Sequence, residues 1–342
     1  MTIEEQIAHN KRNSTLVLVG FSVLVTLIGL FVGWLVAWIS SDDSLTNWTI
    51  VWLTAGLFLA AAVAYSLFVY YNTTSVFMGS VHGRRLDPEN ASLAEKQLLN
   101  VIDELQITAE IPTPEVYLID DQEANAFATG RDPQHAAIGV NRGLLELMDR
   151  EELKGVLAHE MSHIKNYDIR SGSIAVALTS FIAGAGYWLA EIGESMLWFG
   201  SWDDDDDDDR DSNKSSAAIG LVMLIGGWLI QLIGVPVATL MQLALSRQRE
   251  SLADISGVDM TQNPQGLIDA LTKLQEDQVP SSYADSKAAT LCFRTPLSEK
   301  DVKQMKKQGL AEPKRRKFRL TNLLDTHPPL EERIARLHDL ID

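Results

Sequence analysis

The five residues from His159 to His163, which read His-Glu-Met-Ser-His, combine the side chains that a metal-dependent hydrolase needs. Residues four apart lie one turn apart on the same face of a helix, so His159 and His163 can bind one metal ion. Glu160 is rotated by about 100° from His159, which places its carboxylate beside the open coordination position. There it can take a proton from water and later deliver it to the leaving amine. The spacing and ligand types predict one zinc ion per chain, with Glu160 as the base.

A catalytic zinc site needs a third protein ligand and keeps one position open. Glu250 is the best candidate, because Glu250 and Asp254 are four residues apart and share one face of a second helical segment. One carboxylate can bind the metal while the other accepts a hydrogen bond from a histidine ligand and orients its ring. The sequence therefore predicts Glu250 as the third ligand and Asp254 as the support of a histidine.

The histidines lie in a segment, residues 84–170, whose pattern is that of a soluble α+β domain. Leucines and isoleucines recur at helical spacing over Ser92–Gln106 and predict an amphipathic helix. Alternating or β-branched residues predict short strands at Glu115–Ile119, Ala126–Thr129 and Ala136–Val140. Asp149 and Glu152 form a D-x-x-E capping pattern, which predicts that the helix carrying the two histidines begins there and ends near Asn166.

Four long stretches contain no Asp, Glu, Lys or Arg: Asn13–Ser41, Ser44–Gly83, Ser171–Ala190 and Ser215–Ser246. The apolar parts of each are long enough to cross a hydrocarbon core of ~30 Å as a helix. The predicted spans cover about residues 16–39, 48–71, 174–199 and 217–243. Glu191 and Glu194 near the end of the third span fit the outer interface more simply than a role inside the membrane. The predicted fold class is a polytopic α-helical membrane protein with four transmembrane helices and a zincin-like α+β metalloprotease domain.

The spans divide the chain into four parts. Residues 1–83 form an N-terminal tail and a transmembrane hairpin, and residues 171–246 form a second hairpin with an acidic outer loop at 200–216. Residues 84–170 and 247–342 are the two catalytic parts, the first with the histidine helix and the second with the third ligand.

The distribution of Lys and Arg predicts the orientation in the membrane. Most of the basic residues that flank the spans lie on one side: Lys11, Arg12, Arg84, Arg85, Lys165, Arg170, Arg247 and Arg249. Arg210 and Lys214 lie in the loop expected outside. The positive-inside rule therefore places both termini and the active site in the cytoplasm. His163 is nine residues from Gly172, and Glu250 is seven from Leu243. At 1.5 Å per residue, the zinc is expected within roughly 10–20 Å of the membrane surface, where membrane proteins are the expected substrates.

The composition narrows the classes of protein to which the chain can belong. A formal charge of −17 argues against a nucleic-acid-binding protein, and the single cysteine, Cys292, excludes an intrachain disulfide and fits a reducing compartment. Seven consecutive aspartates, Asp203–Asp209, lie in the loop expected outside; they form either a solvated turn or a site for divalent cations. The basic cluster Lys314–Arg319 is either a solvated loop or a contact for anionic lipids.

Four segments together carry a resemblance to a known family: Glu123–Gly130 (EANAFATG), His159–Asn166 (HEMSHIKN), Ser246–Asp254 (SRQRESLAD) and Thr326–Pro329 (THPP). Their order and their placement around the spans are similar to those of the HtpX-type membrane zinc metalloproteases, relatives of the CAAX prenyl proteases. The resemblance implies a zinc endopeptidase that degrades misfolded membrane proteins in the quality control and stress response of a bacterial cytoplasmic membrane. It also implies the ligands His159, His163 and Glu250 and the base Glu160.

The resemblance extends to residues that would contact substrate. Asn125, Ala126 and Phe127 would lie along an edge strand on which an unfolded polypeptide docks as an added strand. His327 would reach the cleft and stabilise the oxyanion; the alternative is a loop histidine fixed by two prolines. Arg333 matches a basic residue of the prenyl proteases near the substrate; the alternative is a charge on a surface helix.

Two other functions are compatible with the same motifs. One is a CAAX-type processing protease, which is less favoured because those relatives have more spans and a large chamber. The other is a membrane chaperone or scaffold without catalysis, whose zinc would be structural. The presence of Glu160 argues against the latter, because a structural zinc site closes its fourth position and needs no base. The expected partners are polypeptide substrates and the lipid bilayer, and no nucleic acid.

Overall fold

The computed structural model describes residues 3–39, 47–199, 210–234, 247–283, 291–294, 296–300, 302–303 and 329–339. The chain forms two compact units, and each is described by itself. The sheet unit comprises Met1–Ser14, Tyr70–Val176 and Gln242–Asp342, and the span unit comprises Thr15–Val69 and Ala177–Met241.

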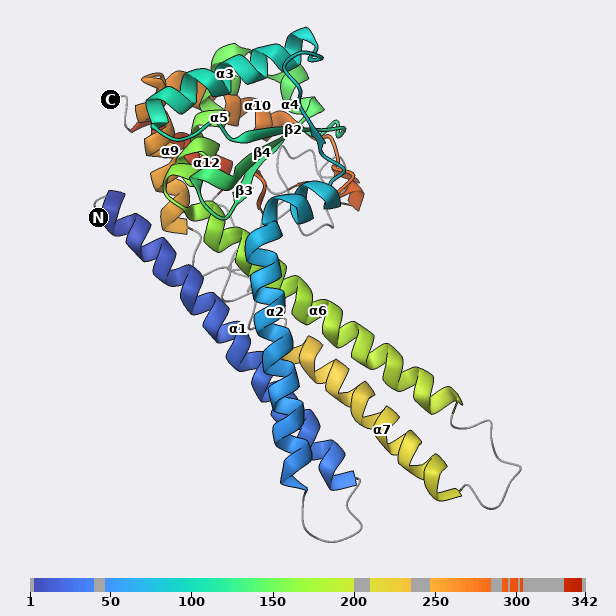
Figure 1. The fold of residues 1–342 in the computed structure, drawn as a ribbon. Helices are drawn as coiled ribbons and strands as arrows, with labels where there is room; N and C mark the ends of the chain where they lie inside the picture. Colours follow the sequence, from blue (N-terminus) through green and yellow to red (C-terminus); the bar gives the residue numbers. More distant parts are fainter. Residues whose placement is uncertain are drawn as a thin grey trace. The chain divides into compact units, whose positions relative to one another are not determined.

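The span unit contains the long apolar parts of four helices: α1 (Ile3–Ile39), α2 (Trp48–Ser80), α6 (Asp168–Phe199) and α7 (Arg210–Leu229) (Figure 1). Among the described residues, three segments are long and apolar enough to cross a membrane: Ile7–Trp38, Trp48–Ser80 and Asp168–Trp198. These segments confirm the first three predicted spans as apolar helices. The second helix continues past the predicted end of its span, after a break in helical geometry at Asn72.

The fourth predicted span is described only in part. The helix α7 passes into a π-helical turn at Ile230–Gly234, and its apolar segment, Ile219–Leu232, is shorter than the three others. Residues 235–246, which include Pro236, lie outside the described residues, as does the aspartate run Asp203–Asp209. A total of four transmembrane helices therefore stays a prediction.

Within the span unit, glycines let α6 and α7 approach closely. A Cβ atom at Gly193 would lie 2.4 Å from the backbone nitrogen of Leu224, and one at Gly227 would lie 2.5 Å from that of Ala190. Small residues at such contacts are typical of helices that associate in a membrane, where close backbone packing replaces the hydrophobic effect.

The sheet unit contains a four-stranded sheet built from β1 (Arg84–Arg85), β2 (Glu115–Ile119), β3 (Ala126–Gly130) and β4 (Ala136–Asn141). The strand order is β1-β2-β4-β3, with β2 parallel to β4 and the other two pairs antiparallel. The three predicted strands are thereby confirmed, each to within a residue or so at its ends. The order also places β3 at an edge of the sheet.

The helices that cover this sheet begin where their capping residues predict. In α3 (Leu93–Ala109), Ser92 and Glu95 form a capping box, and in α5 (Arg150–Lys165) Asp149 and Glu152 do the same. Each box satisfies backbone N–H groups that the first helical turn leaves without partners. The predicted helix that carries His159 and His163 is therefore confirmed.

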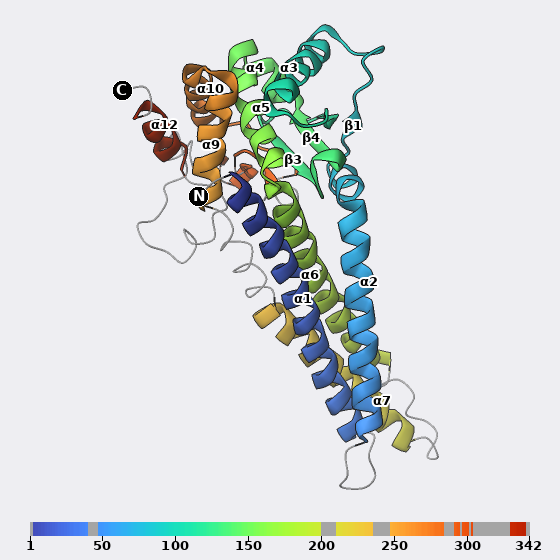
Figure 2. The ribbon, with the colours of Figure 1, turned by 60° about the vertical axis from the view of Figure 1, so that its left-hand side comes forward.

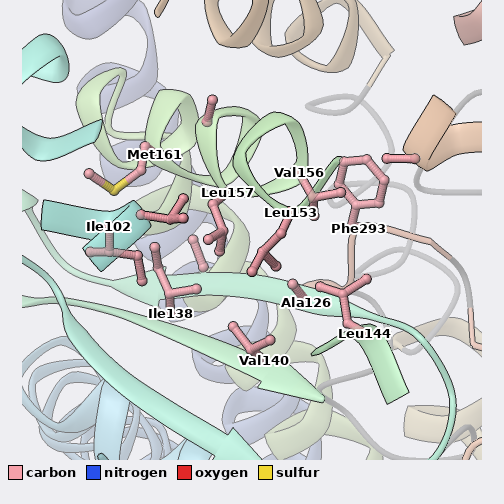
Figure 3. Packing of buried hydrophobic residues seen from close by; sticks show 14 of the residues in the cluster. Ile102, Ala126, Ile138, Val140, Leu144, Leu153, Val156, Leu157, Met161 and Phe293 are labelled. Carbon is pink, nitrogen blue, oxygen red and sulfur yellow. The ribbon is translucent and has the colours of Figure 1, made fainter. Parts of the chain in front are cut away.

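The helix α5 lies at the centre of the sheet unit. Its inner face contributes Leu153, Leu157 and Met161, which pack against Ile102 of α3 and Ile138 of β4 (Figure 3). These side chains recur every three or four residues, so one face of the helix is apolar and buried. The two histidines are thus fixed to the most buried helix of the unit.

The helices α9 (Arg247–Thr261) and α10 (Pro264–Glu276) pack against α5, and α12 (Leu330–His338) packs against α9 and α10 (Figure 2). Glycines permit the close contacts. A Cβ atom at Gly155 of α5 would lie 2.8 Å from the backbone nitrogen of Leu267, and one at Gly257 of α9 would lie 3.0 Å from that of His159. The helix α9 therefore packs directly against the backbone of the histidine helix.

Candidate metal centre

The structure brings together two histidines from α5 and a glutamate from α9. His159, His163 and Glu250 each offer a ligand atom, and these atoms lie within 4.8 Å of one another. The two Nε2 atoms are 3.1 Å apart, and each is 3.6 Å from an oxygen of Glu250. Among the described residues this is the one group with the arrangement of a metal site.

These distances fit a tetrahedral zinc ion. Ligand atoms that lie ~2.0–2.1 Å from a tetrahedral zinc are separated from one another by roughly 3.3 Å, close to the spacing of the three atoms here. Two imidazoles and one carboxylate are also the donor set of many catalytic zinc sites, which leave one position for water or substrate. The residues present therefore fit the zinc ion that the sequence predicts.

Each histidine is oriented by a carboxylate on its other ring nitrogen. Nδ1 of His159 lies 2.9 Å from Asp254, and Nδ1 of His163 lies 3.0 Å from Asp168. A hydrogen bond at Nδ1 directs the lone pair of Nε2 towards the metal position and raises its basicity. The sequence predicts that Asp254 orients a histidine ligand, but no sequence pattern indicates the role of Asp168.

The electrostatics of the two histidines differ because their neighbours differ. Burial and the positive charge of Arg333 lower the pKa of His159 to about 4, which keeps the ring neutral, as a ligand must be. Burial opposes ionisation of His163 as well, but the carboxylates of Asp168, Glu250 and Glu160 outweigh it and raise its pKa to about 9. The same negative potential that favours an imidazolium ion favours a divalent cation between these groups.

Glu160 follows His159 on α5 and is 2% exposed. It lies close enough to His163 and Arg333 to influence the pKa of both groups. The role of Glu160 as the base stays a prediction.

Arg333 occupies a different environment from the one expected for a substrate contact. Its side chain is 0% exposed, and its guanidinium donates hydrogen bonds to both oxygens of Asp254, at 3.0 and 2.6 Å. It also lies 3.3 Å from Nδ1 of His159 and 4.4 Å above the ring of Phe293. Arg333 therefore holds Asp254 in place, which in turn orients His159; a contact with substrate stays a prediction.

The expected edge-strand segment is placed as the resemblance implies, but its first part is already paired. Ala126 and Phe127 belong to β3 at the sheet edge. The carbonyl oxygen of Ala126 accepts a hydrogen bond from Phe293 at 2.7 Å, and the amide of Asn125 exchanges hydrogen bonds with the backbone of Arg294 at 2.8 and 3.1 Å. Asn125 therefore anchors the segment Leu291–Arg294 against β3.

Phe293 is a site residue that sequence reasoning missed. Its ring packs edge-on against His159, with the ring centroids 4.8 Å apart, and is 1% exposed. The segment around it shows no clear periodicity that could have indicated this contact. His327 lies outside the described residues, so its proposed role at the oxyanion stays a prediction.

Cys292 is buried beside this segment, with 0% exposure, and burial raises its pKa well above the usual value. Because the thiolate is the reactive form, we expect no reaction of the native protein with iodoacetamide at pH 8 and full reaction after denaturation. Mass spectrometry of the two samples checks this. Equal labelling in both would contradict the burial of Cys292.

Comparison with known proteins places the chain in a family. Peptidase family M48 matches residues 88–341, which include all three candidate ligands and the candidate base. The chain belongs to peptidase family M48. M48 members are zinc metallopeptidases, so this chain is a metalloprotease, and its apolar helices make it a membrane-associated one.

Similar proteins match almost the whole chain. Proteins named "Protease HtpX homolog" from Limosilactobacillus fermentum and Streptococcus gordonii are 37% identical over 336 residues and 38% identical over 338 residues. Both alignments cover 98% of this chain and 99% of the relative. The crystal structure of S. mikatae Ste24p matches with a TM-score of 0.45 and 18% identity, over 98% of this chain and 67% of that one.

Proposed function

We propose that this M48 metalloprotease is a zinc-dependent endopeptidase that hydrolyses peptide bonds of misfolded or damaged membrane proteins at the cytoplasmic face of a bacterial cell membrane. The observation that carries the proposal is the spacing of the ligand atoms of His159, His163 and Glu250, with Glu160 beside them. The relatives named HtpX from Limosilactobacillus fermentum, Streptococcus uberis and Streptococcus gordonii, which are bacteria, support the quality-control role and the bacterial membrane.

The residues of the site divide the chemistry between them. His159, His163 and Glu250 would hold the zinc ion, which when bound acts as a Lewis acid towards water and the peptide carbonyl. Glu160 accepts a proton from the attacking water and transfers it to the nitrogen of the leaving amine. The buried surroundings exclude bulk water from Glu160, so its charge interacts strongly with the reacting groups.

The edge strand β3 supports unfolded polypeptides as the substrate class. A substrate that pairs with a sheet edge is recognised mainly through its backbone, so many sequences can bind. The backbone N–H of Phe293 already donates a hydrogen bond to the carbonyl oxygen of Ala126. The substrate would therefore pair with the part of β3 from Phe127 to Gly130. A protease that removes damaged proteins needs this tolerance of sequence.

The cytoplasmic orientation can be tested with two engineered cysteines. Glu89→Cys lies at an exposed site of the sheet unit, and Asn47→Cys lies at an exposed site before the second apolar helix. We expect a membrane-impermeant maleimide to label Asn47→Cys on intact cells and to label Glu89→Cys only after lysis, because Cys292 is buried and gives no background. Labelling of Glu89→Cys on intact cells would overturn the orientation.

The proposed activity is tested with full-length protein purified in detergent without metal. We expect cleavage of an unfolded polypeptide after zinc is added and none before. Equal cleavage with and without zinc would contradict the proposal. Cleavage confined to a prenylated C-terminal peptide would favour the CAAX-type alternative, and zinc binding without any cleavage would favour a chaperone or scaffold.

A further inference from the structure

The start of α1 contacts the end of the histidine helix within the sheet unit. Asn10 is 1% exposed, and its Nδ2 donates hydrogen bonds to the carbonyl oxygen of Asn166 at 2.8 Å and to Oδ1 of Asp168 at 2.7 Å. Both partners are acceptors, so the orientation of this amide follows from chemistry alone. In Figure 2 the first turns of α1 lie beside the point where α5 passes into α6.

Asp168 connects this contact to the metal centre. One carboxylate oxygen accepts the hydrogen bond from Asn10, and the other lies 3.0 Å from Nδ1 of His163. The position of Asp168 therefore sets the direction in which the ring of His163 presents Nε2. Carboxylates in this place commonly govern metal affinity, because they fix the ring and its tautomer.

The residue between α5 and α6 also contacts the start of α1. Tyr167, between the two helices, has a φ of +59°, in the left-handed region that non-glycine residues rarely adopt. Lys11, next to Asn10, places its ammonium group 4.2 Å from the centre of the Tyr167 ring. The start of α1 thus contacts Asn166, Tyr167 and Asp168, the three consecutive residues that follow the last turn of α5.

We propose that Asn10 is a positioning residue of the metal centre, which holds Asp168 so that His163 is oriented towards zinc. The inference rests on the proposed zinc site and adds to it a residue that lies outside the region matched by family M48, residues 88–341. The helix α1 then has two functions. Its apolar part anchors the protein, and its first turns complete the site.

The test measures zinc affinity in the full-length Glu160→Gln protein, in which self-cleavage cannot interfere. Asn10→Asp keeps the size of the side chain but removes the donor and sets a negative charge against Asp168. We expect a loss of zinc affinity of about 10-fold by chelator competition, with a changed visible spectrum of the cobalt-substituted protein. Asn13→Ala, one turn further along the same helix, is the matched control and should change neither quantity.

A double-mutant cycle shows whether Asn10 acts through Asp168. In Asn10→Asp/Asp168→Asn the exchanged side chains can again form a hydrogen bond, and the amide oxygen at position 168 can still accept from His163. In the Asp168→Asn background, we expect Asn10→Asp to cause no further loss of zinc affinity. An equal loss in both backgrounds, or unchanged affinity of Asn10→Asp, would overturn the inference.

Failure of the inference and failure of the zinc site give different results. If the Glu160→Gln protein without further changes binds no zinc, the proposed function itself is wrong. If it binds zinc and Asn10→Asp binds it equally well, only the role of Asn10 is wrong. Should Asn10→Asp not fold, Asn10→Ser keeps a small polar side chain without the added charge, and a smaller loss of affinity with the same dependence on Asp168 is expected.

Discussion

Glu160→Gln is expected to abolish peptide hydrolysis while leaving the metal in place. The amide cannot accept a proton from water, so the rate should fall by about 10²- to 10⁴-fold, the usual contribution of a general base. The zinc content should stay at one ion per chain, because the ligand atoms belong to His159, His163 and Glu250. Initial rates on an unfolded polypeptide, with zinc measured on the same samples, check both parts.

Two outcomes would contradict this role of Glu160. Unchanged hydrolysis would show that another group acts as the base, and loss of zinc together with activity would show that Glu160 holds the metal. Glu299→Gln, at a surface side chain that is 75% exposed, serves as the matched control. It should alter neither the rate nor the zinc content.

Asp254→Ala is expected to destabilise the sheet unit severely. The substitution leaves the guanidinium of Arg333, which is 0% exposed, without the carboxylate that receives its two hydrogen bonds. Removal of one partner from a buried ion pair costs about 3–5 kcal/mol, since the remaining charge stays out of water. The thermal unfolding temperature of the metal-free protein, followed by tryptophan fluorescence, should fall by many degrees.

The double substitution Asp254→Ala/Arg333→Ala separates the charge effect from the loss of packing. With neither charge of this ion pair left, the double variant should be more stable than Asp254→Ala alone. If its loss of stability equals the sum of the two single losses, the two side chains do not interact and the ion pair is not the cause. Glu299→Ala, which removes one partner of an exposed pair, should change the unfolding temperature little.

The candidate metal ligands could be predicted from the sequence because they lie at short, regular spacings within single helices. His159 and His163 are one helical turn apart, Glu250 and Asp254 repeat that spacing on α9, and the capping residue Asp149 marks where α5 begins. Short-range rules of helix geometry are sufficient for such inferences. The need for a third zinc ligand predicts Glu250 at the metal, and Glu250 lies on α9, which packs against α5.

The remaining residues of the site could not be inferred in this way. Asn10 and Asp168 are 158 residues apart, and Phe293 reaches His159 from a segment without periodicity. Arg333 is a charged residue on a helix with polar neighbours, so its sequence indicates a surface position or a substrate contact. Its complete burial arises only when α12 packs beside α9, which places Asp254 opposite the guanidinium.

X-ray absorption at the zinc edge of the zinc-loaded Glu160→Gln protein identifies the atoms that bind the metal. We expect two imidazole nitrogens and carboxylate or water oxygens at ~2.0–2.1 Å. We also expect His163→Ala to remove one imidazole contribution. A closed shell of four protein ligands, a sulfur ligand, or a spectrum unchanged by His163→Ala would contradict the metal centre described here.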